Sequence, residues 1–114
     1  MIVEEAERLL DPVADIEGFV LACLVDASTG MVLASRGGRD DISLPAAAAG
    51  GADIAQVLSL LAAELPADGL EDVLVTFRSL IYVARQIVQD AEPPILLVVI
   101  LDRIRANLKQ YFTV

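Results

Sequence analysis

Apolar residues near the start of the chain recur at the i, i+3, i+4, i+7 spacing of one helix face. They are Ala6, Leu9, Leu10 and Val13. Pro12 lies in this stripe, so we expect a kink or a restart of the helix, with Asp11 as its cap. Glu17 and Gly18 end the segment.

Two short strands are predicted next. Residues 19–25 are apolar at every position, which is typical of a strand covered on both faces. Residues 26–30 have the composition of a turn, and residues 31–35 complete a hairpin. A polar loop then runs over residues 36–43.

A helical period returns over residues 44–65 and predicts the longest helix of the chain. Pro45 is acceptable in its first turn, and the sequence Pro-Ala-Asp-Gly at residues 66–69 stops it. One face has large side chains and is expected to lie on the sheet: Ile54, Leu58, Leu61 and Leu65. A second face has mostly small side chains: Ala46, Ala49, Gly50, Asp53, Val57 and Leu60.

The last third of the chain predicts three strands and a helix. Residues 70–77 and 80–89 are rich in β-formers and are joined tightly around Arg78 and Ser79. A loop at residues 89–94 keeps two prolines out of the sheet. Residues 95–101 form a second fully apolar strand, and residues 103–112 a helix with an apolar side made of Ile104, Leu108 and Tyr111.

The predicted order is therefore α-β-β-α-β-β-β-α, an α+β fold. The two strands that are apolar on both faces belong in the middle of a sheet with helices above and below. We expect them side by side at the centre of a five-stranded antiparallel sheet, with one hairpin at each edge and helices on both faces. A length of 114 residues suits a single domain over residues 1–114.

Charge and composition exclude several classes of protein. Seventeen acidic against eight basic residues give a net charge of −9, which argues against nucleic acid or an anionic membrane as a partner. The sequence has no histidine, so catalysis and metal sites that depend on histidine are excluded. The first residues lack a basic signal region, and the longest aliphatic run has seven residues, against about 20 for a membrane span. We expect a cytoplasmic protein.

Candidate chemistry is sparse. Cys23 lies inside an apolar strand and is interpreted as a small buried hydrophobe. The acidic pairs at residues 40–41 and 71–72 lack further metal ligands, and the glycines at 37–38 lack the rest of a phosphate-binding loop. An arginine finger is an arginine side chain that stabilises the charge of a phosphate group during its transfer. Nothing in the sequence marks any of the candidates for this role: Arg36, Arg39, Arg78 and Arg85. We therefore expect no enzymatic activity, no cofactor and no metal.

Three segments resemble the roadblock/dynein light-chain family. They are residues 16–26 with 30–35 (IEGFVLACLVD, GMVLAS), the alanine-rich helix from Pro45, and residues 95–100 (ILLVVI). The resemblance covers nearly the whole chain and rests on packing and turn residues. It implies a profilin-like sheet and a non-enzymatic module that dimerises through central helices and edge strands. Bacterial members commonly act beside a small Ras-like GTPase, as activators or scaffolds, while others belong to motor or signalling assemblies.

The second face of the central helix is the most informative feature. Its small residues are consistent with a helix packed close on the sheet. In a monomer, however, the patch that they form with Val57 and Leu60 would be exposed, and exposed apolar patches of this kind typically mark interfaces. We predict a homodimer through edge strand 70–77 and through Ala46, Ala49, Gly50, Val57 and Leu60. For a GTPase partner we predict contacts with Asp53, Gln56 and Glu64, with the loop at residues 36–41 nearby.

Three function classes stay open at this point. The first is a homodimeric scaffold or regulator of a small Ras-like GTPase. The second is a structural subunit of a larger complex without a GTPase. The third is a small-ligand sensor or an unrecognised enzyme, because a fold does not fix a function.

Overall fold

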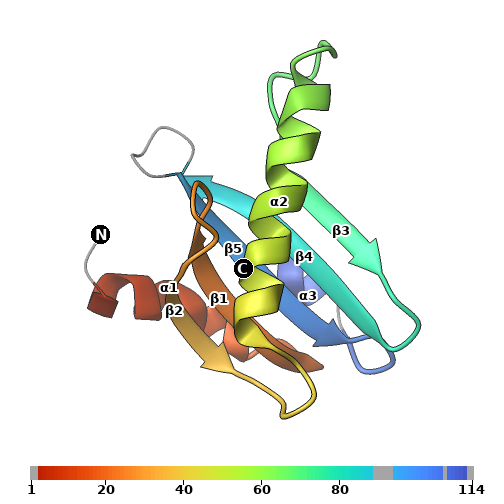
Figure 1. The fold of residues 1–114 in the computed structure, drawn as a ribbon. Helices are drawn as coiled ribbons and strands as arrows, with labels where there is room; N and C mark the ends of the chain where they lie inside the picture. The colour runs from red at the N-terminus through yellow and green to blue at the C-terminus, as the bar shows by residue number, and fades with distance from the viewer. Residues whose placement is uncertain (1–2, 89–93, 107, 113–114) are drawn as a thin grey trace.

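The computed structural model describes residues 3–88, 94–106 and 108–112. Its elements follow the predicted order (Figure 1). They are α1 (Val3–Ala14), β1 (Phe19–Asp26), β2 (Val32–Gly37), α2 (Leu44–Ala62), β3 (Asp72–Thr76), β4 (Leu80–Val88), β5 (Ile95–Asp102) and α3 (Leu108–Phe112). The predicted loop at residues 89–94 lies, except for Pro94, outside the described residues.

The five strands form one sheet in the order β2-β1-β5-β4-β3, and every neighbouring pair is antiparallel. Strands β1 and β5 lie side by side in the interior, with Cys23 opposite Val98. The hairpins occupy the two edges. In the β3–β4 hairpin the Phe77 backbone N–H donates to the Leu80 carbonyl at 2.8 Å, so this connection is as tight as predicted. The α+β fold class and the sheet arrangement are confirmed.

Helices cover both faces of the sheet (Figure 1). Side chains of β1 and β5 alternate between the two faces, as the pleat requires. One core contains Leu10 and Val13 of α1 and Tyr111 of α3, and the other contains Ala48 and Ala52 of α2. Because each central strand is buried on both sides, its sequence has no polar position in its interior.

Helix α1 differs from the prediction at its C-terminal end. It runs from Val3 to Ala14 with Pro12 inside it, and Asp11 is a helical residue, so the predicted cap is wrong. Pro12 lies in the last turn, where its missing N–H removes a single helical hydrogen bond. The Asp11 carboxylate instead accepts a hydrogen bond from Arg36 of β2 at 3.3 Å.

Helix α3 is shorter than predicted. Residues 103–105 form a turn, and Ile104 is 90% exposed, so the predicted apolar side shared by Ile104 and Tyr111 is wrong. The Asp102 carboxylate accepts hydrogen bonds from the backbone N–H groups of Ile104 and Arg105 at 2.9 and 3.3 Å. Such a side-chain bond competes with helix formation and holds these residues in the turn.

Helix α2 packs on the sheet through its small residues, which corrects the predicted orientation. Its buried residues are Ala48, Gly51, Ala52 and Ala55. A Cβ atom on Gly51 would lie 2.5 Å from the Tyr82 hydroxyl oxygen, and this hydroxyl donates to the Ala47 carbonyl at 2.7 Å. The helix backbone therefore approaches the sheet too closely for the large side chains that we expected there. Leu61 and Leu65 are more than half exposed.

Candidate interaction surface on helix α2

The C-terminal half of α2 is an exposed apolar surface. From Gln56 to Ala62 no residue of the helix is buried, and the helix extends past the sheet (Figure 1). Val57 is 64% exposed and Leu60 is 71% exposed. Exposed apolar side chains that are contiguous, rather than scattered singly, are typical of interaction sites.

A row of leucines faces the edge of the sheet at β3. Leu58, Leu61 and Leu65, here called the leucine row, line a groove of about 400 Å³ together with Leu70 and with Asp72, the first residue of β3. Strand β3 pairs only with β4 within the described chain, so its outer edge offers unpaired backbone groups. The residues that we expected beneath the helix therefore form an apolar border beside a free strand edge.

The residues predicted for the dimer interface are all at least partly exposed, but they do not form one stripe. Ala46, Gly50 and Val57 lie opposite the sheet-facing residues and form, with Asp53, what we call the crest of α2. Ala49 instead faces the β1–β2 turn, because a Cβ atom on Gly30 would lie 3.2 Å from the Ala49 Cα. Leu60 lies on the same flank as Ala49.

The residues predicted for partner binding are exposed and also lie apart. Asp53 is on the crest, Glu64 follows the end of the helix, and Gln56 is turned toward the β1–β2 flank. The loop at residues 36–41 precedes the N-terminus of α2, so it lies at the other end of the helix from Glu64. No lysine or arginine occurs between residues 40 and 77, so every charged residue of this segment is acidic.

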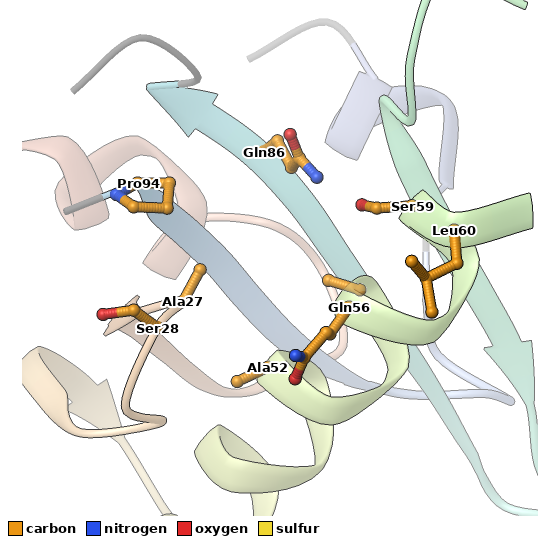
Figure 2. A pocket seen from close by; sticks show the side chains of 9 residues that line it. Ala27, Ser28, Ala52, Gln56, Ser59, Leu60, Gln86 and Pro94 are labelled. Atoms are coloured by element: carbon orange, nitrogen blue, oxygen red, sulfur yellow. The ribbon is translucent and has the colours of Figure 1, made fainter. Parts of the chain in front are cut away.

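A second groove runs along the β1–β2 flank of α2 (Figure 2). It measures about 540 Å³, and its lining residues carry no charge. Its polar side chains include Gln56 and Ser59 of α2 and Gln86 of β4, while Leu60 and Pro94 supply apolar walls. We call it the amide groove. Without a cation it is unsuited to phosphate groups, whereas the carboxamides can bond both N–H and C=O groups of a polypeptide.

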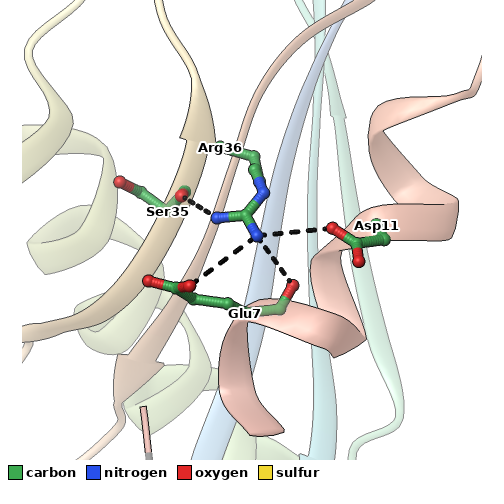
Figure 3. Close-up of polar contacts among 4 residues, drawn as sticks. All are labelled: Glu7, Asp11, Ser35 and Arg36. Atoms are coloured by element: carbon green, nitrogen blue, oxygen red, sulfur yellow. Dashed lines mark hydrogen bonds and ion pairs between the residues drawn. The ribbon is translucent and has the colours of Figure 1, made fainter. Parts of the chain in front are cut away.

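Three of the four arginines considered as candidate fingers are held by carboxylates of their own chain. Arg36 lies between α1 and β2, 3.3 Å from Asp11 and 3.9 Å from Glu7, and its other nitrogen donates to the Ser35 carbonyl (Figure 3). Arg36 therefore fastens α1 to the edge of the sheet.

The other two pairs have short, two-point contacts. Arg39 donates to Asp41 at 2.8 and 3.1 Å, which raises the pKa of Arg39 and lowers that of Asp41. Arg85 donates to Asp72 at 2.6 and 3.0 Å. Arg78, in the β3–β4 turn, has no ion pair with any carboxylate that the structure describes.

Cys23 is fully buried between the sheet and α2, and burial raises the pKa of its thiol to about 12. The thiol therefore stays protonated and unreactive near neutral pH, so the interpretation as a buried hydrophobe is confirmed. Among the described residues, no three histidine, cysteine, aspartate or glutamate side chains form a group that could hold a metal ion.

Helix α2 is also long and apolar enough, by length and composition alone, to cross a membrane. The length of the longest uninterrupted aliphatic run does not reveal this property of α2, because Asp53 and Gln56 interrupt the apolar sequence. Only 22% of the relevant stretch is buried inside the chain. The rest of this stretch is exposed or partly exposed in the single chain.

Solved structures share this fold. The gliding protein MglB from Thermus thermophilus superposes with a TM-score of 0.80 at 22% identity, over 95% of this chain and 78% of that one. An MglB structure with a tetrameric arrangement gives 0.80 at 22% identity, over 95% and 77%. A Roadblock/LC7 domain from Streptomyces avermitilis gives 0.70 at 16% identity, over 89% and 80%. No family model and no curated protein matches the sequence.

The central strands, the antiparallel order and the helix placement thus define an α+β domain of the profilin-like class. Within that class the chain has the roadblock fold. The fold implied by the resemblance of the hairpin, the central helix and the last strand is confirmed.

Proposed function

We propose that this chain is a non-enzymatic, homodimeric regulator or scaffold that binds a small Ras-like GTPase. The single observation that carries the proposal is the exposed apolar surface of α2 beside a free strand edge, on a roadblock fold. The family resemblance of the sequence implies both the dimer and the GTPase. One of the similar structures is of MglB in a tetrameric arrangement, so self-association is a property of that protein.

Two features support a dimer through the β3 edge. The strand has unpaired backbone groups, and the leucine row lies on the same side of the molecule. Two copies related by a two-fold axis would join their sheets at β3 and bring both leucine rows together. Gly50 and Val57 on the crest would border this contact. Most of the apolar surface of α2 would then be covered.

The opposite flank of α2 stays free in such a dimer. It contains Ala49 and Leu60 together with the amide groove, and we assign it, with Asp53 on the crest, to contact with the partner. The surface has only acidic charges, so a partner surface with arginine or lysine is complementary. Charge complementarity of this kind speeds association and weakens with salt.

The GTPase is tested by capture with the intact chain. Ras-like GTPases of the native host, identified by mass spectrometry, are loaded with GDP or with a non-hydrolysable GTP analogue. We expect stronger capture of one nucleotide state, because switch segments order around the γ-phosphate. Charge reversal by Asp53→Lys and Glu64→Lys should weaken capture.

A matched control is Glu5→Lys, which makes the same charge change at an exposed position of α1 on the other side of the sheet. Equal capture of both nucleotide states, unchanged by the α2 variants, would count against a regulator and favour a plain scaffold of the GTPase. Capture of no GTPase by a chain that dimerises would favour the second candidate, a structural subunit of a larger complex without a GTPase.

A further inference from the structure

The two ends of strand β3 have complementary apolar features. Phe77, directly after the last residue of the strand, is 55% exposed. At the other end lies the groove of about 400 Å³ between the leucine row and Leu70. An exposed aromatic side chain and an open apolar groove are the two halves of a well-packed contact. Within one chain they are too far apart to meet, because five strand residues span roughly 17 Å.

Phe77 and the groove lie on the same face of the sheet. The Phe77 N–H donates to the Leu80 carbonyl at 2.8 Å, so Phe77 continues the β3–β4 ladder opposite Leu80. Side chains that are opposite each other in a ladder share a face of the sheet. Leu80 packs with Tyr82 in the core beneath α2. Phe77 therefore points to the α2 side of the sheet, where the groove opens.

The same hydrogen bond shows which backbone groups of β3 are free. Along an antiparallel strand, the residues that bond to a given neighbour are every second one. Since Phe77 bonds to β4, the backbone groups of Asp72, Leu74 and Thr76 point to the free edge. A second copy that pairs across a two-fold axis bonds these same residues. Full overlap of the two five-residue strands places the axis at Leu74.

We propose that a second copy binds in this register, so that Phe77 of each subunit fills the groove of the other. The contact presupposes the β3 dimer of the proposed function and adds to it the register and the anchoring side chain. Leu74 pairs with its own copy, and Phe77 then lies opposite Glu71 of the partner subunit, beside the partner's groove. That pair is not hydrogen-bonded, and side chains of such pairs are the closer ones. A two-fold axis perpendicular to the sheet keeps both grooves on the same face as both phenylalanines.

The charges at the two ends of β3 agree with this register. Arg78, next to Phe77, has no ion pair with any carboxylate in the described part of the chain. In the partner subunit it would lie beside residues 68–72, whose charged side chains are all acidic: Asp68, Glu71 and Asp72. Opposite charges therefore meet twice across the axis. Such complementarity favours this alignment over one that brings like ends together.

A cysteine at the axis tests the register. Leu74→Cys should form a disulfide between subunits on oxidation, because Cα atoms of hydrogen-bonded pairs lie about 5.5 Å apart, within disulfide reach. The matched control Thr76→Cys, on the same strand and face, should not, because its two copies lie four positions apart, roughly 13 Å. Cys23 is fully buried and does not take part. A chain that sediments as a dimer but gives no disulfide through Leu74→Cys, or gives one equally through Thr76→Cys, would overturn the register and leave the proposed dimer standing.

Truncation of Phe77 tests the anchor. Phe77→Ala should raise the dimer Kd roughly tenfold or more in sedimentation equilibrium. The control Met31→Ala truncates a side chain that is 67% exposed just before β2, at the far edge of the sheet, and should leave the Kd unchanged. An unchanged Kd for Phe77→Ala in a dimeric chain would overturn the anchor alone. A chain that is monomeric at tens of micromolar would refute the dimer of the proposed function itself.

A double variant shows whether Phe77 reaches the groove of the partner subunit. In a chain that already carries Leu65→Ala, the effect of Phe77→Ala on the Kd should shrink several-fold, because the two side chains share one contact. Leu65 lines the groove at the other end of β3 from Phe77, so coupling arises only between subunits. Effects that simply add would contradict the contact.

Exchange of charges tests the alignment of the two ends. Arg78→Glu and Glu71→Arg should each weaken the dimer several-fold, and the two together should restore it. The control Arg8→Glu makes the same charge change on α1 and should have a smaller effect. A double variant no tighter than either single one would contradict the alignment.

Discussion

Truncating Leu61 should weaken the proposed dimer by an amount that follows from its exposure. Leu61 is 54% exposed in the single chain, so the dimer would bury about half of the side chain. Complete burial of a leucine contributes about 1.5–3 kcal/mol, so half contributes about 0.75–1.5 kcal/mol in each copy. Because both copies carry the change in a two-fold interface, the loss of dimerisation free energy is about 1.5–3 kcal/mol. Leu61→Ala should therefore raise the dimer Kd roughly tenfold to a hundredfold.

Sedimentation equilibrium over a range of protein concentrations measures this Kd directly. The control is Leu33→Ala, which makes the same truncation at a leucine of β2 that is 39% exposed, at the far edge of the sheet. The control should leave the Kd unchanged. Equal shifts for both variants, or an unmodified chain that is monomeric at tens of micromolar, would refute the reasoning about the leucine row and the β3 edge.

Three further predictions concern the fold. Gly51→Ala should lower the free energy of unfolding by about 1–3 kcal/mol, because the added Cβ would meet the Tyr82 hydroxyl. The control Gly50→Ala should be neutral or stabilising, because no atom lies within 4 Å of its added Cβ. Urea unfolding at high dilution measures both. The partner Arg39 lowers the pKa of Asp41 in the folded chain. The Asp41 carboxylate therefore stabilises the fold at pH values above its unfolded-state pKa, and this stabilisation is lost as the pH falls through its folded-state pKa. Asp41→Asn should therefore flatten the loss of stability below about pH 4, measured by thermal unfolding across pH. Because burial raises the pKa of Cys23 to about 12, iodoacetamide at pH 8 should label it only in denaturant, as mass spectrometry would show.

The sheet could be predicted from the sequence because its centre leaves a simple pattern. Strands buried on both faces have no polar interior position, so their apolar runs alone place residues 19–25 and 95–101 at the centre. Turn residues then fixed the hairpins, and the remaining strands had to lie at the edges. The order of elements followed from these two constraints.

The orientation of α2 could not be predicted by apolar periodicity, because two faces of this helix are apolar. Hydrophobicity favoured the face with Leu58 and Leu61, but close approach to Tyr82 selects the smallest side chains. A signal was present in the sequence, since Ala48, Gly51, Ala52 and Ala55 recur at i, i+3, i+4 and i+7. Because these leucines were predicted to lie on the sheet, their exposure beside the β3 edge was not predicted.

The limits of α3 had a weaker signal. An aspartate just before a predicted helix suggests a cap, but Asp102 bonds two N–H groups of a turn, and the helix begins only at Leu108.

The central claim is that a dimer of this chain binds a Ras-like GTPase in a nucleotide-dependent way. The most direct measurement is the mass of the complex by light scattering after size exclusion, with the GTPase loaded with GDP or with a GTP analogue. We predict a complex of the dimer with the GTPase in one nucleotide state, and a free dimer and free GTPase in the other. A monomeric chain, or a dimer that forms no complex in either state, would contradict the claim.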